Sequence, residues 1–248
     1  MNTYKLIVAY DGTDYSGWQI QPTGTAIANI LHKTFYTVFQ KKVSILGASR
    51  TDAGVHALGQ VVRAQIDFSI SADALQHAWN CKLPSSIVIR SCELVENSFH
   101  PHIAVEQKTY WYNFFIDKPL PFVARYGMFF FKPLNIDKLQ QALNVFVGTH
   151  DFRSFCTEED QQKDTIRTID AINLRYIRRL NMYQIEVKGE RFLRYMVRRI
   201  VGAALETASR KKYSIFDLKA TLQAKNPEHS LPTAPAKGLL LRKIKYNK

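Results

Sequence analysis

The sequence is short of cysteine and of long apolar runs. Its 248 residues include only 3 cysteines, and no two of them form a CxxC pair. This usage argues against a disulfide framework and predicts reduced thiols in a cytoplasmic protein. No stretch approaches the ~20 apolar residues of a membrane-spanning helix, so we expect no membrane association. The first five residues lead directly into a strand-like pattern, which predicts neither a signal peptide nor a transit peptide.

Acidic residues are also scarce relative to basic ones. The chain has 34 Lys and Arg against 21 Asp and Glu, which leaves a net charge of +13. A surplus of this size favours a polyanionic partner, either nucleic acid or an anionic membrane surface, over generic basicity. With 46% hydrophobic and 22% charged residues, the chain otherwise has the composition of an ordinary soluble protein of one or two domains.

Several catalytic and metal-binding signatures are missing. The sequence contains no GxSxG, GxxxxGK[ST] or GxGxxG, so lipase-type, P-loop and dinucleotide-binding sites have no support. His56 follows Asp52 by four residues, and His100 and His102 lie two apart, but neither spacing is joined by a second matching cluster. We therefore predict no metal site and expect the histidine pair to mark a turn.

Hydrophobic periodicity predicts strands interspersed with helices. The strand-like runs are 4–10, 43–46, 60–68, 87–95, 110–116, 126–131, 166–178, 182–188 and 238–246, and the helical runs are 26–39, 71–82, 135–146, 192–209 and 214–224. Several successive strands follow each other without a crossover helix, which favours an α+β fold with mainly antiparallel pairing. A boundary within 99–105 predicts two α+β domains, at 1–100 and 101–248.

The densest group of reactive side chains lies in the segment 47–57, between two predicted strands. It places the Arg50 guanidinium, the Asp52 carboxylate and the His56 imidazole within seven residues, beside two glycines that allow close backbone approach. The alternative is a hairpin loop in which Asp52 binds its own turn and Arg50 is merely solvated.

Two further segments combine basic and aromatic or apolar residues. In a strand over 108–114, Lys108, Tyr110 and Tyr112 would share one face, where aromatic rings stack on bases or pack in the core. In a helix over 192–209, Arg191, Arg194 and Arg198 would form a stripe along one flank. Such a stripe is either a solvated face or a face from which one arginine turns inward. An arginine turned inward would keep a carboxylate such as Asp52 ionised.

Taken in order along the chain, these segments resemble the tRNA pseudouridine synthase A (TruA) family. The resemblance is carried by 10–19, 48–57 with 59–60, 99–100 with 108–112, 148–155 with 167–169, 192–202 and 234–239. Each motif alone is weak, whereas the ordered set over nearly the whole chain is specific. One departure lies in 26–33, where a basic residue replaces the family's acidic position, and it concerns helix contacts, not the chemistry.

The resemblance implies a fold, an activity and partners. The fold would be two similar-sized α/β domains, whose mainly antiparallel sheets join into one extended mixed sheet flanked by helices, with a basic cleft between the domains. The activity would be isomerisation of uridine to pseudouridine at positions 38, 39 and 40 of the tRNA anticodon stem-loop, with no metal or organic cofactor. The partners would be tRNA and a second subunit in a homodimer.

The resemblance also implies roles for single residues. Asp52 matches the essential aspartate, which would attack C1′ as a nucleophile or remove the C2′ proton to give a glycal, and both mechanisms remain open. Tyr110 would stack on the base and help to remove the C5 proton, and Arg50 would help to flip the nucleotide. Arg198 would pair with Asp52. The residues expected to bind RNA are Arg191, Arg194, Arg199, Lys108 and His56.

Two other functional classes remain as alternatives. A non-catalytic RNA-binding protein could keep the same scaffold, although a carboxylate facing an anionic ligand would then have no purpose. A hydrolase built on Asp52 and His56 would need an orienting partner for its base, and no third motif supplies one.

Overall fold

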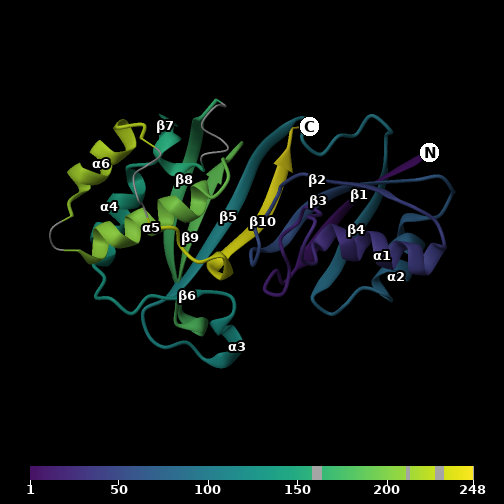
Figure 1. Cartoon of the computed structure of the whole chain (residues 1–248), viewed down its shortest axis with the longest axis horizontal. Coiled ribbons are helices and arrows are strands. Elements are labelled where there is room, and N and C mark those ends of the chain that lie inside the picture. The colour runs from purple at the N-terminus through teal and green to yellow at the C-terminus, as the bar shows by residue number, and fades with distance from the viewer. Residues whose placement is uncertain (158–163, 211–212, 227–231, 248) are drawn as a thin grey trace. The chain divides into compact units, whose positions relative to one another are not determined.

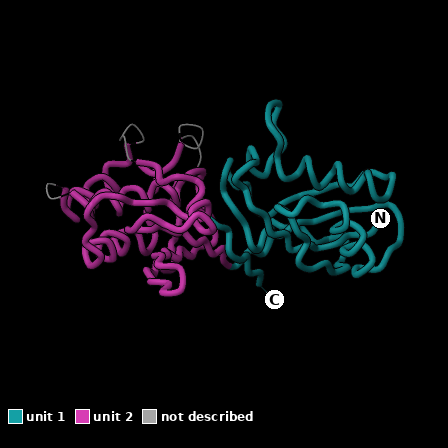
Figure 2. The backbone as a smooth tube through the Cα atoms, turned by 90° about the horizontal axis from the view of Figure 1, so that it is seen from below, with its two compact units in different colours: residues 1–106, 240–248 teal, residues 107–239 magenta. Residues whose placement is uncertain are grey.

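The computed structural model of the protein describes residues 1–157, 164–210, 213–226 and 232–247. The chain forms two compact units, unit 1 with Met1–Glu106 and Leu240–Lys248, and unit 2 with Gln107–Leu239 (Figure 2). The predicted boundary near residue 100 lies close to the first crossing between the units. The last strand, however, groups with unit 1 because it pairs with a strand there.

In the part of the chain that the structure describes, ten strands form a mixed sheet flanked by helices, so the predicted α+β class is confirmed (Figure 1). The basic cleft expected between the domains stays a prediction. Within the described residues, no helix has the length and apolar character to cross a membrane.

Unit 1 is built on antiparallel strands in the order β4-β1-β3. Its strands are β1 (Asn2–Tyr10), β2 (Ser44–Gly47), β3 (His56–Ile66), β4 (Ile87–Val95) and β10 (Leu239–Tyr246). The short β2 pairs antiparallel with β3, and β10 pairs parallel with the start of β3. Helices α1 (Ile27–Phe39) and α2 (Ala72–Asn80) complete the unit, and Phe35 meets Trp79 edge-on in its core, with ring centroids 4.9 Å apart.

Unit 2 has the strand order β5-β9-β8-β7, in which each neighbouring pair is antiparallel, and the short β6 pairs parallel with β5. Its strands are β5 (Val105–Phe115), β6 (Met128–Phe129), β7 (Gly148–Asp151), β8 (Ile166–Ile177) and β9 (Met182–Gly189), and its helices are α3 (Pro121–Ala124), α4 (Ile136–Asn144), α5 (Met196–Ser209) and α6 (Ile215–Gln223). The predicted strands 166–178 and 182–188 are confirmed and form an antiparallel hairpin, whose turn contains Asn181 with a left-handed φ of 46°. The predicted strand 126–131 is reduced to the two residues of β6.

Side-chain caps explain where three helices begin. Ser71, Asn135 and Ser214 each accept a hydrogen bond from a backbone N–H in the first turn of α2, α4 and α6. These bonds satisfy N–H groups that have no partner within the helix, and all three predicted starts are confirmed.

The predicted helix 192–209 starts four residues later than expected. Tyr195 takes a left-handed φ of 60°, so α5 begins only at Met196. Arg191 and Arg194 therefore precede the helix, and the predicted stripe of three arginines along its flank is wrong.

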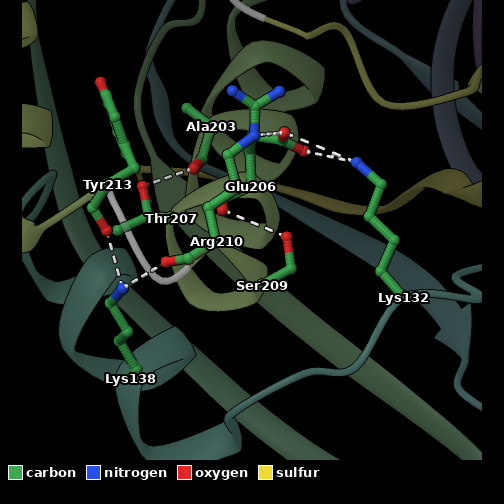
Figure 3. A network of polar contacts seen from close by, with 8 residues as sticks. All are labelled: Lys132, Lys138, Ala203, Glu206, Thr207, Ser209, Arg210 and Tyr213. Carbon is green, nitrogen blue, oxygen red and sulfur yellow. Dashed lines mark hydrogen bonds and ion pairs between the residues drawn. The ribbon is translucent and has the colours of Figure 1, made fainter.

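The C-terminal end of α5 is anchored by charged side chains (Figure 3). Lys138 of α4 donates hydrogen bonds to the carbonyl oxygens of Arg210 and Tyr213, over 3.1 and 2.7 Å. Glu206 forms ion pairs with Arg210 and, over 3.2 Å, with Lys132. These contacts tie the end of α5 to α4 and to the chain before it.

Candidate active site

Asp52 lies half-buried in the loop that joins β2 to β3 in unit 1. The carbonyl oxygen of Asp52 accepts a hydrogen bond from the N–H of Val55, over 3.1 Å. Gly54 has a φ of 77°, the left-handed conformation that a type II turn requires at its third position. The backbone on the C-terminal side of Asp52 is therefore fixed by a tight turn.

The loop is also fixed before Asp52, by Gln60 of β3. The Gln60 side-chain oxygen accepts from the Ser49 N–H over 3.1 Å, and its amide group donates to the Ser49 carbonyl over 2.5 Å. Gln60 is fully buried and Ser49 nearly so, which makes this two-way contact costly to break. The sequence interpretation assigned Gln60 no role, although a glutamine inside an apolar strand was a usable signal.

His56, the first residue of β3, directly follows the same loop and is buried. Its imidazole is 3% exposed, and its Nδ1 accepts a hydrogen bond from the Gly12 N–H over 3.1 Å. The same Nδ1 lies 3.1 Å from a carboxylate oxygen of Asp11. The RNA contact expected of His56 stays a prediction, and the buried ring has little surface left for it. Arg50, by contrast, is exposed.

Tyr110 lies on β5 of unit 2, opposite Val187 of β9, and is 7% exposed. Its ring meets Phe192 edge-on, with centroids 5.2 Å apart and an angle of 82° between the planes. A Cβ atom at Gly189 would lie 3.2 Å from the Phe192 ring, so glycine provides the room in which that ring packs. Tyr110 is therefore held by packing, as a positioned ring must be.

Lys108 lies two residues before Tyr110 and opposite Gly189. The pKa of its ammonium group is lowered to about 8, first by burial and then by the nearby Arg191 charge, while the Glu190 charge opposes both effects. At pH 7 the group is still mostly a cation, but it loses its charge far more readily than an exposed lysine.

Tyr112, which was predicted to share a face with Lys108 and Tyr110, has a structural role. It is fully buried, and its hydroxyl donates to the carbonyl oxygen of Pro235 over 3.0 Å. Burial raises the pKa of this hydroxyl, and the Arg198 charge only partly opposes that effect. A Cβ atom at Gly238 would lie 2.5 Å from the Tyr112 ring, so the strand and the segment before β10 pack very closely.

Arg198 lies near the start of α5 and is held by the chain around Ala234. Its Nε donates to the Ala234 carbonyl oxygen over 2.8 Å, and the Ala234 N–H donates to the Arg198 carbonyl over 3.1 Å. The guanidinium carbons of Arg198 and Arg194 lie 4.9 and 5.2 Å from the centroid of the Tyr195 ring. The two arginines thus gather around one aromatic ring and not along a helix face.

The other predicted RNA-binding residues differ in exposure. Arg191 is exposed and pairs with Glu190 over 3.1 Å, whereas Arg199 is half-buried and donates to the Cys156 carbonyl oxygen. Their contacts with RNA stay predictions. Among the residues that the structure describes, no three His, Cys, Asp or Glu side chains gather in a way that could hold a metal ion.

Comparison with known proteins identifies the family to which the chain belongs. A family model described as tRNA pseudouridine synthase matches residues 6–102 and 142–247. A tRNA pseudouridine synthase A from Thermodesulfovibrio yellowstonii is 35% identical over 99% of this chain and 100% of its own length. One from Limosilactobacillus reuteri is 36% identical over 99% of this chain and 97% of its own length. The chain belongs to the tRNA pseudouridine synthase family.

The ranges that the family model matches contain some of the candidate residues and not others. The two matched ranges include Arg50, Asp52 and Arg198, but they leave out 103–141 and with it Lys108 and Tyr110. A solved structure of a Cbf5-Nop10-Gar1 complex covers 82% of this chain and 45% of its own, at 12% identity and a TM-score of 0.36. So weak a likeness carries no argument, and the family rests on the sequence relatives.

Proposed function

We propose that this member of the tRNA pseudouridine synthase family converts uridine to pseudouridine at positions 38, 39 and 40 of the tRNA anticodon stem-loop. The observation that carries the proposal is Asp52, a half-buried carboxylate held in a loop within the segment that the family model matches. The relatives that match over their full length bear the name of the same activity.

The reaction needs no cofactor, because it only rearranges bonds within one nucleotide. The N1–C1′ bond breaks, the uracil rotates, a C5–C1′ bond forms, and a proton leaves C5 while N1 gains one. Asp52 would either attack C1′ directly or remove the C2′ proton, and a carboxylate with a fixed backbone suits both steps. The choice between the two mechanisms stays open.

Three further residues complete the proposed catalytic group. Tyr110 would stack on the flipped base and assist removal of the C5 proton, as its positioned ring favours. Arg50 would enter the stem-loop and stabilise the flipped nucleotide, as its exposure allows. In the tRNA complex Arg198 would pair with Asp52 and keep it ionised.

The proposed partners are the tRNA anticodon arm and a second copy of the chain, in a cytoplasmic homodimer. The net charge of +13 supports an electrostatic contribution to RNA binding. Lys108, Arg191, Arg194 and Arg199 are the cations proposed to contact phosphates, and His56 is a weaker candidate because it is buried.

The test is tritium release from tRNA labelled at uridine C5, with substrates that keep a single uridine at position 38, 39 or 40. Wild type should release label from each of them, whereas Asp52→Asn should bind tRNA and release none. The matched control is Asp67→Asn, an exposed carboxylate of unit 1 that pairs with the surface residue Lys41. Near-normal release by Asp52→Asn would overturn the assignment. Binding without any release by wild type would favour a non-catalytic RNA-binding protein.

A further inference from the structure

The segment that begins at the last residue of β1 packs directly on the Asp52 loop. It runs from Tyr10 to Trp18 and belongs to the motif 10–19, to which the reaction assigns no role. Its contacts with the loop all lie within unit 1. These contacts reach the residues on both sides of the catalytic candidate Asp52.

Thr51, the residue before Asp52, is held from two sides. The Tyr10 hydroxyl and the Thr51 hydroxyl share a hydrogen bond of 2.7 Å, and the Trp18 N–H donates to the Thr51 carbonyl oxygen over 3.0 Å. Tyr10 is 4% exposed and Thr51 8%, so neither hydroxyl can exchange its partner for bulk water. The Tyr10 ring lies 6.1 Å from the Trp18 ring, which fixes its direction.

The two chain segments approach each other closely on both sides of Asp52. Gly17 has a φ of 99°, and a Cβ atom there would lie 2.6 Å from the Thr51 carbonyl oxygen. On the other side of Asp52, the Gly54 N–H donates to the Tyr15 carbonyl over 3.3 Å. The backbone on both sides of Asp52 therefore rests on the same segment.

We propose that Tyr10 is a positioning residue for Asp52, and that its hydroxyl acts through Thr51 to hold the carboxylate where the nucleotide sugar arrives. The inference rests on the proposed function of Asp52. A reacting group must be held within ~0.5 Å of its productive position, and a displacement of ~1 Å lowers rates by up to ~100-fold. The Tyr10–Thr51 bond joins two side chains, so a side-chain change at either residue removes it without altering the backbone.

The test compares Tyr10→Phe, Thr51→Val and the double variant in single-turnover pseudouridine formation. Each single variant keeps the shape of the side chain and loses one hydroxyl. We expect the rate constant to fall between about 10- and 100-fold, while the tRNA Kd stays within about 2-fold of wild type. Because both hydroxyls serve one bond, the double variant should be no slower than the slower single variant.

The matched control is Tyr4→Phe. Tyr4 lies on the same strand, is 1% exposed, and donates its hydroxyl to the Ile70 carbonyl oxygen over 2.5 Å, remote from the loop in sequence. This variant should lose stability as Tyr10→Phe does and keep the wild-type rate. Equal rates for Tyr4→Phe and Tyr10→Phe, or additive losses in the double variant, would overturn the inference. An inactive wild type would instead refute the proposed function.

Discussion

The ring of Phe192 meets the ring of Tyr110 edge-on, with an angle of 82° between their planes. Phe192 reaches this position because Gly189 has no side chain and because α5 starts only after Tyr195. The non-helical stretch before α5 therefore serves to bring an aromatic residue against β5. The orientation of the Tyr110 ring depends on that contact.

Replacing Tyr110 by phenylalanine should separate stacking from proton transfer. Tyr110→Phe keeps the ring and its contact with Phe192, so the tRNA Kd should stay within about 2-fold of wild type, whereas turnover should fall by about 100-fold or more. Tyr110→Ala should in addition lose about 1 to 3 kcal/mol of binding free energy. Tritium release and equilibrium binding measure the two effects, and unchanged turnover in Tyr110→Phe would remove the hydroxyl from the mechanism.

Replacing Gly17 by alanine should destabilise the fold through collision as well as backbone strain. A left-handed conformation costs a residue with a side chain about 1 to 2 kcal/mol, and the contact at 2.6 Å from the Thr51 carbonyl adds to that cost. Gly148→Ala is the matched control, because φ there is 104° and the nearest atom is 3.6 Å away. The Tm of Gly17→Ala should fall clearly further than that of Gly148→Ala. Equal shifts would mean that the loop gives way at no cost.

The lowered pKa of Lys108 predicts a pH-dependent contribution to tRNA binding. With a pKa of about 8, the group is a cation at pH 7 and mostly neutral at pH 9, where an ordinary lysine keeps its charge. If Lys108 contacts a phosphate, the slope of log Kd against log salt should become shallower by about 0.7 to 0.9 between these pH values. Lys108→Arg should keep the steeper slope at pH 9, and a wild-type slope that does not change with pH contradicts the contact.

The lowered pKa of Lys108 also makes the free energy of unfolding depend on pH. The unfolded chain holds the Lys108 proton up to about pH 10.5, whereas the folded protein releases it near pH 8. Between these values the unfolded state binds more protons, so this group makes folding more favourable as pH rises. Lys108→Met should flatten that rise in the free energy of unfolding, and a denaturant titration at pH 7 and pH 9 measures it.

Lys138 should contribute to stability through the end of α5. Its ammonium group donates to two carbonyl oxygens that follow the helix, so Lys138→Met leaves both without that donor and should cost about 1 to 2 kcal/mol. The control is Lys41→Met, which removes the surface pair with Asp67 at 3.4 Å and the approach of the ammonium group to the Phe68 ring, 5.1 Å from its centroid, and should cost about 0.5 kcal/mol. Thermal unfolding of both variants tests the difference. Equal losses would show that the Figure 3 contacts are no stronger than a surface ion pair.

The order of the elements followed from the sequence because local signals and burial agree for most of them. The starts of three helices are marked by capping residues, Ser71, Asn135 and Ser214. Capping is a local signal, because the side chain bonds to a backbone N–H only three residues away. The start of α5 was misplaced because the apolar spacing continues through 192–195, while Tyr195 adopts a left-handed conformation that periodicity cannot reveal.

The loop of Asp52 was predictable as a reactive segment, but its support was not. Arg50, Asp52 and His56 are neighbours in sequence, so their grouping needed no tertiary information. Gln60 and Tyr10 hold that loop across 11 and 41 residues of sequence, through contacts that exist only once β1, β2 and β3 have assembled. Distances of this kind are set by the packed sheet and not by local pattern.

The return of β10 to unit 1 has a consequence for how the protein is made. Because the chain is synthesised from its N-terminus, β3 has to wait for its parallel neighbour Leu240–Leu241 until all of unit 2 has left the ribosome. A nascent chain interrupted within unit 2 would therefore carry the Asp52 loop on a sheet with an open edge beside His56. Unit 1 is thus completed only after unit 2 has been synthesised, so a product truncated within unit 2 exposes the strand edge that β10 would cover.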